Sequence, residues 1–142
     1  MISETLMWTH PPLQGVAALI GVVAMWQGWK RVAMQLGRKV IFPWKQHVRM
    51  GTWSLLLWTL GALGFYVTHD IFGSTHITGL HAVLAWPVIF LSVFGLVSGY
   101  VMDRHKKKRK WLPIAHGVGN VILLGLVLVE CVTGCALISS FF

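Results

Sequence analysis

The sequence predicts an all-α integral membrane protein, folded as an antiparallel four-helix bundle of membrane-spanning helices. Hydrophobic residues make up 56% of the 142 residues and charged residues only 11%, whereas an ordinary soluble domain has roughly 25% charged residues. Too few polar side chains remain to cover a water-soluble globule, and so apolar a chain is not a disordered one. We expect one domain over residues 1–142.

Four apolar runs predict the four helices, at residues 11–29, 48–68, 77–102 and 111 to about 138. Each has or approaches the ~20 residues that a helix needs to cross ~30 Å of hydrocarbon. Glycine and proline interrupt the runs, as membrane helices tolerate. The connections are short, which favours an up-down-up-down order. We recognise no internal repeat in the sequence.

The basic residues predict the orientation. Of the twelve Lys and Arg, six lie at residues 30–49, which connect the first run to the start of the second, and six at residues 104–110, between the last two. The positive-inside rule therefore predicts a multi-pass protein of the inner (plasma) membrane, with both basic loops cytoplasmic and both termini outside. The run DRHKKKRK at 103–110 is basic enough for nucleic acid, but we expect it to contact anionic membrane lipid instead. No positively charged region opens the chain, so no cleavable signal peptide is predicted.

Four of the seven histidines fall near helix ends, one on each predicted helix. They are separated by 37, 34 and 35 residues. Because consecutive helices run in opposite directions, this spacing places the first and third outside and the second and fourth toward the cytoplasm. In a cyclic bundle the first and third helices are diagonal, so each leaflet receives two facing histidines. The four are His10, His47, His81 and His116, while His69, His76 and His105 are expected in loops or at loop edges.

Two opposed imidazoles suit the iron of a b-type haem, whereas zinc prefers three or four clustered ligands. We therefore expect two haems b, with their irons held by the pairs His10/His81 and His47/His116. Small residues share the helix faces of these histidines, which allows close approach of a macrocycle or of a neighbouring helix. These faces hold Gln14, Ala17, Gly21, Met25 and Gly28, then Gly51, Ser54, Trp58, Gly61 and Phe65, then Ala85, Val88, Ser92, Gly95 and Gly99.

Four short motifs resemble the haem-histidine positions of the cytochrome b-561 family. They are HPPLQG, KQHVRMG, GLHAVLAW and AHGVGN, and the resemblance covers residues 9–134. It implies a transmembrane electron carrier with two b haems and the same two histidine pairs. Eukaryotic members have an extra helix on either side of this core, so the chain resembles the short prokaryotic four-span members. Gln14 stands where the family often has Met, and no ascorbate site can be transferred.

Other features of the sequence carry two interpretations each. Glu130 lies 14 residues after His116, about 21 Å of helix rise, so we expect it at the level of the outer haem. There it would relay a proton or hydrogen-bond a haem-bound group. The alternative is an interfacial carboxylate in contact with water. By the same rise, Gly95 marks the level of the inner haem relative to His81.

The outer face and the helix ends carry further candidates. His69, Asp70 and His76 would line a partner site or be solvated. Cys131 and Cys135 are expected to be buried small hydrophobes, without covalent haem attachment. Interfacial anchors are predicted at Trp8, Trp29, Trp44 and Trp111.

The expected function is single-electron transfer across the membrane between two haems, by an electron carrier or a transmembrane oxidoreductase. One alternative is a quinol-reactive cytochrome b subunit that anchors a larger redox complex. Another is a haem-free small transporter or assembly factor. The electron donor and acceptor, whether quinol, cytochrome or small reductant, stay open, as does assembly into a homo-oligomer or a redox complex.

Overall fold

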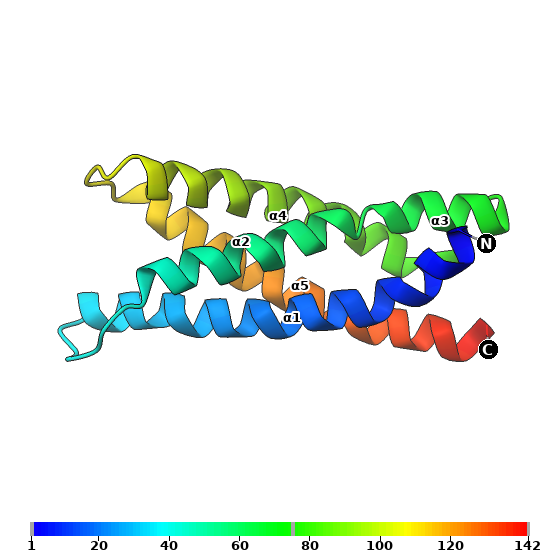
Figure 1. Cartoon of the computed structure of the whole chain (residues 1–142), viewed down its shortest axis with the longest axis horizontal. Helices are drawn as coiled ribbons and strands as arrows, with labels where there is room; N and C mark the ends of the chain where they lie inside the picture. The colour runs from blue at the N-terminus through cyan, green and yellow to red at the C-terminus, as the bar shows by residue number, and fades with distance from the viewer. Residues whose placement is uncertain (1, 75, 142) are drawn as a thin grey trace.

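The computed structural model describes residues 2–74 and 76–141, and its described residues form helices joined by short turns and loops, with no strand (Figure 1). Within these described residues, five α-helices and one 3-10 turn follow one another. They are α1 (Ile2–Gln35), α2 (Trp44–Leu60), α3 (Leu63–Phe72), η1 (His76–Thr78), α4 (Leu80–Arg104) and α5 (Trp111–Phe141).

In the part of the chain that the structure describes, four helical segments are long and apolar enough to cross a membrane. They are Glu4–Gln35, Trp44–Phe72, Leu80–Arg104 and Trp111–Ser140, the second of which combines α2 and α3. Their outer faces expose large apolar side chains such as Leu19, Phe90 and Val132, a surface that hydrocarbon solvates and water does not. The predicted all-α fold with four spans is confirmed, and the chain has the architecture of a multi-pass membrane protein.

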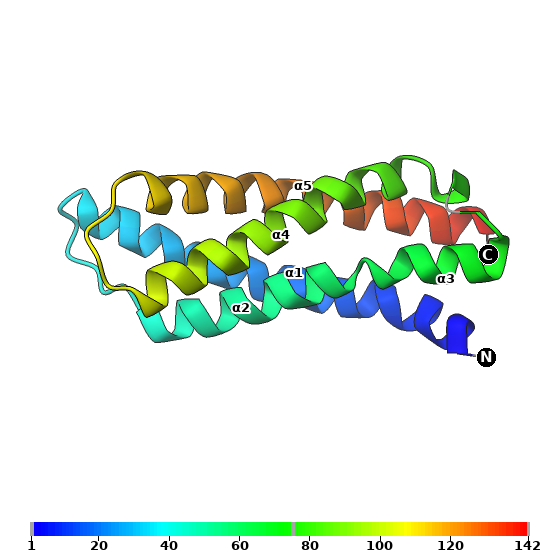
Figure 2. The same ribbon diagram turned by 90° about the horizontal axis from the view of Figure 1, so that it is seen from above.

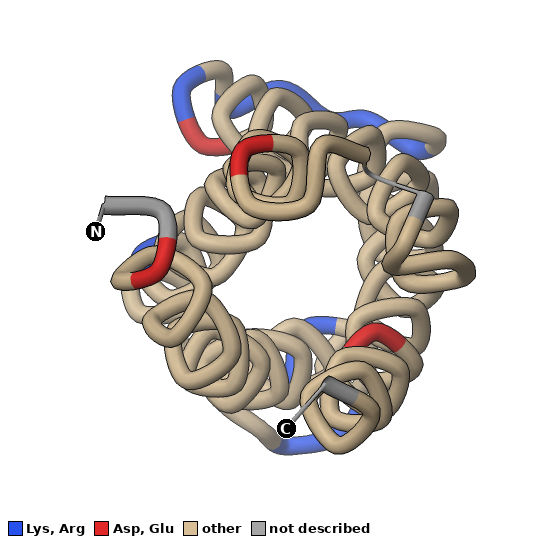
Figure 3. The backbone as a smooth tube through the Cα atoms, turned by 90° about the vertical axis from the view of Figure 1, so that its right-hand side faces the viewer, with Lys and Arg blue, Asp and Glu red and all other residues tan. Residues whose placement is uncertain are grey.

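The spans form a ring in the order α1, α2–α3, α4, α5. Helix α1 packs against α2 and α5, and α4 packs against the same two neighbours. Seen along the bundle, the spans surround a common axis (Figure 3). The pairs α1/α4 and α2/α5 are therefore diagonal, as the cyclic order predicted. The buried core includes Ala17, Ala18, Leu55, Trp58, Val88, Leu123 and Val127.

The basic residues gather at one end of the bundle. The loops 36–43 and 105–110 both lie at the end opposite the two termini (Figures 1 and 2). All twelve Lys and Arg fall within residues 30–49 and 104–110, that is, in these loops and the adjoining helix ends. The structure thus places the two basic segments at the same end of the bundle.

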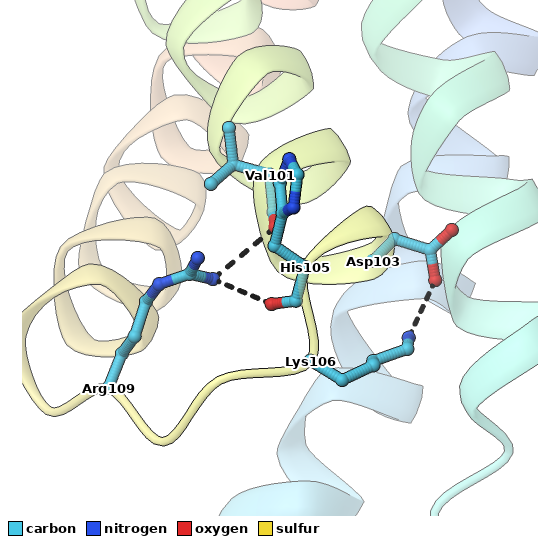
Figure 4. Close-up of polar contacts among 5 residues, drawn as sticks. All are labelled: Val101, Asp103, His105, Lys106 and Arg109. Atoms are coloured by element: carbon cyan, nitrogen blue, oxygen red, sulfur yellow. Dashed lines mark hydrogen bonds and ion pairs between the residues drawn. The ribbon is translucent and has the colours of Figure 1, made fainter.

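Two cations organise the turn after α4 (Figure 4). Arg109 Nη1 donates hydrogen bonds to the carbonyls of Val101 at 3.3 Å and His105 at 3.0 Å. Lys106 Nζ lies 3.0 Å from Asp103 Oδ1 and 3.9 Å from the ring centroid of Trp44 on α2. A cation at a helix C-terminus satisfies carbonyls that lack helical partners. The loop is therefore tied to both α4 and α2.

Two expected helix ends were wrong. Helix α1 begins at Ile2 rather than near Pro11, so His10 lies inside the helix and Pro11 and Pro12 are helical residues. Figure 1 shows the first turns of α1 bending away from the rest, as expected where proline removes backbone N–H donors. The second span continues to Phe72 rather than ending at Thr68, and α3 ends on the left-handed Gly73, a common helix terminator. His69 lies in the last turn of α3, at the edge of the loop.

Candidate functional site

The outer histidine pair, at the end where the termini lie, comes from the diagonal helices α1 and α4. The ring centroids of His10 and His81 lie 6.4 Å apart, and their planes are inclined by 81°. Metal–imidazole bonds of about 2 Å, plus roughly 1 Å from nitrogen to ring centre, give a centroid separation of about 6 Å for a metal between two imidazoles. The structure brings together the two residues that the spacing paired, at a distance that suits one shared metal.

The inner pair consists of His47 on α2 and His116 on α5, which are also diagonal. Both side chains are half-buried. They lie within electrostatic reach of each other. Two histidines therefore occupy each end of the bundle interior, in the pairing that the sequence predicted.

Three of the four imidazoles have a hydrogen-bond partner for Nδ1 on the neighbouring helix. His47 Nδ1 lies 2.9 Å from the carbonyl oxygen of Ala24 on α1. His116 Nδ1 lies 2.7 Å from Ser98 Oγ on α4. The Nδ1 of the third, His81, lies 2.6 Å from a carboxylate oxygen of Glu130 and 3.0 Å from a hydroxyl oxygen, both on α5.

These partners fix which ring nitrogen carries the proton. A carbonyl or carboxylate oxygen only accepts, so the Nδ1 atoms of His47 and His81 donate. Ser98 already donates its proton to the carbonyl of Phe94 at 2.6 Å, so its oxygen accepts from His116. In each neutral ring Nε2 then keeps its lone pair, the form in which imidazole binds a metal.

Each of the four histidines also packs the Cε1 edge of its ring against a glycine on the adjacent span. A Cβ atom added to the glycine would lie 3.2 to 3.5 Å from Cε1 in every case. The pairs are His10 with Gly64, His47 with Gly28, His81 with Gly134, and His116 with Gly99. Most real Cβ contacts are longer than the three shortest of these, so glycine leaves the space in which each ring sits.

The histidines and glycines together reveal an internal repeat that we did not recognise from the sequence. Every span has a histidine followed 17 or 18 residues later by its glycine. Within each hairpin, the histidine of one span packs on the glycine of the other. The interval is 17 residues in the span that is broken between α2 and α3. At this break Gly64 N donates a hydrogen bond to Gly61 O and Phe65 N to Ala62 O, as in a 3-10 helix. Such turns rise ~2.0 Å per residue instead of ~1.5 Å, so fewer residues cover the same height.

The repeat also corrects the expected separation of the two levels. Gly99, not Gly95, contacts the inner histidine His116. Gly95 lies one turn earlier, and a Cβ there would meet Leu55 and Asn120. Because 18 residues separate His81 from Gly99, the levels are about 27 Å apart along the helix rather than about 21 Å.

Glu130 lies at the level of the outer pair, as its distance from His116 along α5 predicted, and it contacts His81 directly. Its second carboxylate oxygen is buried without a hydrogen-bond partner. Within the described part of the chain, buried atoms in the same condition are Gln27 Oε1, Trp58 Nε1 and Ser92 Oγ. Unpaired buried polar atoms are costly, so they leave hydrogen-bonding capacity for a bound group inside the bundle. At each level the donor set, two imidazoles from diagonal helices, is of the type that a haem iron takes.

The remaining candidates lie apart from the histidine pairs or are only partly described. His105 is exposed in the basic loop, and the side chain of His76 lies outside the described residues. Among the described residues, no group of three or more His, Cys, Asp or Glu is placed to hold a metal ion. Cys131 is half-buried, whereas Cys135 is exposed and not buried as expected, because it faces outward on α5. The four expected anchors, Trp8, Trp29, Trp44 and Trp111, are all exposed.

An open hollow of about 350 Å³ lies beside the outer pair. It is formed by the chain entering α4 and by the last turns of α5. His81 and Thr133 reach its inner side, and Ile77, Leu80, Ala136 and Leu137 contribute apolar walls. A flat, mostly apolar ligand entering here would reach the helix turn that holds His81.

Sequence reasoning found the four histidines but missed the residues that hold them. Ala24 acts through its backbone carbonyl, which no side-chain pattern reveals. Gly64 and Gly134 were not singled out, although the repeated interval of 17 or 18 residues after each histidine could have found them. No family model, curated protein or solved structure gives a significant match to this chain.

Proposed function

We propose that this chain is a transmembrane electron carrier that binds two b-type haems, one between His10 and His81 and one between His47 and His116. The observation that carries the proposal is the approach of His10 and His81, from two diagonal helices, to a ring-centroid distance of 6.4 Å. The Nδ1 partners of three histidines, and the glycine under each ring, support it.

The chain's own residues perform three tasks in this proposal. The four imidazoles serve as ligands, and the partners of Nδ1 hold three of the rings in place with the Nε2 lone pair free for a metal. The apolar spans exclude water, and the two levels divide the passage across the membrane into two steps. When bound, each iron supplies reversible one-electron oxidation and reduction.

The resemblance to the cytochrome b-561 family and the orientation belong to the same proposal. The two basic loops at one end of the bundle support a cytoplasmic position for that end, with both termini outside, in the inner (plasma) membrane. The family resemblance is supported by the four ordered motifs and by the diagonal arrangement of α1/α4 and α2/α5.

Haem content is the direct test. The protein purified in mild detergent should have a Soret band, a sharp reduced α band and two haems per chain by pyridine haemochrome assay. Because the chain has no CxxCH motif, acid–acetone should extract both. His105→Ala is the matched control, because His105 is exposed in a loop, and it should keep both haems. A folded but colourless protein would overturn the proposal and leave a transporter or assembly factor.

The hollow beside His81 favours a second function, oxidation or reduction of a quinol as the membrane anchor of a larger redox complex. Its apolar walls and the nearby Thr133 hydroxyl suit a lipid-soluble ring with polar oxygens. Haem reduction by a soluble quinol analogue should then slow when Ala136→Trp fills the hollow. Unchanged reduction kinetics would leave the hollow without this role.

A further inference from the structure

We propose that Glu130 is a positioning residue that lowers the reduction potential of the outer haem below that of the inner one, so that an electron shared between the two haems resides mainly at the inner site. The inference rests on the proposed function, and it concerns the direction in which the two sites favour an electron.

The geometry at the outer level is that of a carboxylate held against a ligand imidazole. Glu130 Oε2 lies 2.6 Å from His81 Nδ1, and both side chains are mostly buried. The hydroxyl of Thr133, also close to Nδ1, donates its own proton to the backbone carbonyl of Glu130 at 3.1 Å. The carboxylate therefore accepts the Nδ1 proton. Glu130 is also within electrostatic reach of the opposite ligand, His10.

The inner level has neutral partners instead. His47 faces the backbone carbonyl of Ala24, and His116 faces the hydroxyl of Ser98. A cation, Arg31, acts electrostatically on His47, and the other Lys and Arg residues lie toward this same end. The two sites thus share their ligand type but differ in the charge beside the ligands.

This difference has a definite electrostatic sign. A carboxylate hydrogen-bonded to imidazole makes the imidazole a stronger electron donor to its metal. It therefore stabilises the oxidised iron, which has the higher charge, and the low dielectric of the bundle interior strengthens the effect. Arg31 acts in the opposite direction at the inner level. Both effects make the outer haem the harder one to reduce.

The test is a spectroelectrochemical titration of the full-length protein carrying haem. His47→Ala leaves the outer haem as the main reducible species and His81→Ala leaves the inner one, so the two wild-type potentials can be assigned. The outer haem should have the lower value. If it has the higher value, the proposal is overturned even without any change at Glu130.

Glu130→Gln then isolates the carboxylate, because glutamine keeps the shape and a hydrogen-bond acceptor but removes the charge. At fixed ambient potential the ratio of reduced to oxidised outer haem should rise at least tenfold, a shift of about 59 mV for one electron. The inner potential should not move. Glu130→Asp keeps the charge, so the outer potential should stay near its wild-type value. His105→Ala, at an exposed loop residue, should leave both potentials unchanged.

Each outcome separates this inference from the proposed function. Two haems in the wild type with an unchanged outer potential in Glu130→Gln would overturn the role of Glu130 and leave the electron carrier intact. Absence of haem from the wild type would overturn the proposed function itself. If Glu130→Gln loses the outer haem, the wild-type potentials test the proposal instead: a lower outer potential supports it, and a higher outer potential overturns it.

Discussion

The side-chain amide of Gln14 donates a hydrogen bond of 2.9 Å to the backbone carbonyl of Leu57 on the neighbouring span. Leu57 lies just before the break that separates α2 from α3. Gly61 N donates to the same carbonyl at 3.1 Å and to that of Trp58 at 3.0 Å. A Cβ on Gly61 would lie 2.9 Å from the Trp58 carbonyl oxygen. The break is therefore built from a glycine and from a polar side chain of α1.

Replacing Gln14 with Leu should weaken the contact between α1 and the second span. Hydrogen bonds between membrane helices average about 0.6 kcal/mol and reach about 1.7 kcal/mol, so we expect a loss of that order in the free energy of unfolding. Reversible unfolding in mixed detergent micelles would measure it. Gln46→Leu is the control, because Gln46 is exposed. Equal stability of both variants would mean that the Gln14 hydrogen bond contributes nothing.

The glycines beneath the histidines should each control one haem. A Cβ at position 134 would lie 3.3 Å from His81 Cε1, so Gly134→Ala should displace that ring and lower the content of outer haem. Gly28→Ala should do the same to the inner haem, since its Cβ would lie 3.2 Å from His47 Cε1. Haem-to-protein ratios and redox titration would show which haem is lost.

Gly125→Ala provides the matched control on α5, because nothing lies within 4 Å of a Cβ there. Alanine in place of an unconstrained helical glycine should be neutral or slightly stabilising. If Gly134→Ala binds both haems as well as Gly125→Ala does, the glycine contacts do not govern the site.

Orientation can be measured by cysteine labelling of intact cells. In a background with Cys131→Ser and Cys135→Ser, Ser74→Cys should react with a membrane-impermeant maleimide added outside. Lys107→Cys should react only after the membrane is permeabilised, because the positive-inside rule puts its loop in the cytoplasm. The opposite pattern would reverse the orientation and exchange the two haem faces.

If the chain conducts electrons in two steps, as proposed, each haem is necessary for conduction. His81→Ala should lose the outer haem or convert it to a high-spin form, while the inner haem survives about 27 Å away along the helix. In vesicles with a reductant on one side and ferricyanide on the other, the variant should lose most transmembrane electron flow. Normal flow with one haem missing would contradict the two-step path. Two low-spin haems in the variant would contradict the ligand assignment.

The fold could be predicted from the sequence because its determinants are coarse. Apolar runs of span length fixed the helices, and the spacing of the histidines fixed the diagonal pairs. The helix ends were harder to predict. Helix α1 continues through Pro11 and Pro12 back to Ile2, since prolines in membrane helices do not have to end the helix.

The surroundings of the histidines were harder to predict than the histidines. The contact between Glu130 and His81 joins residues 49 positions apart, and only the packing of α4 on α5 brings them together. The helix rise between His116 and Glu130 predicted the level of Glu130 in the bundle, but it did not predict that Glu130 contacts His81. Gly95 was misassigned because a face of small residues repeats every turn, and only the position of His116 distinguishes Gly99 from it.

The pairing of histidines between the two helical hairpins, α1 with α2–α3 and α4 with α5, has a consequence for biogenesis. Each hairpin contributes one histidine to each level, so the first hairpin leaving the translocon contains two half-sites and no complete one. A cofactor that needs both axial ligands is retained only once the second hairpin has docked. If the chain binds two haems as proposed, their loading is a late event in assembly, because both sites become complete only when the two hairpins dock.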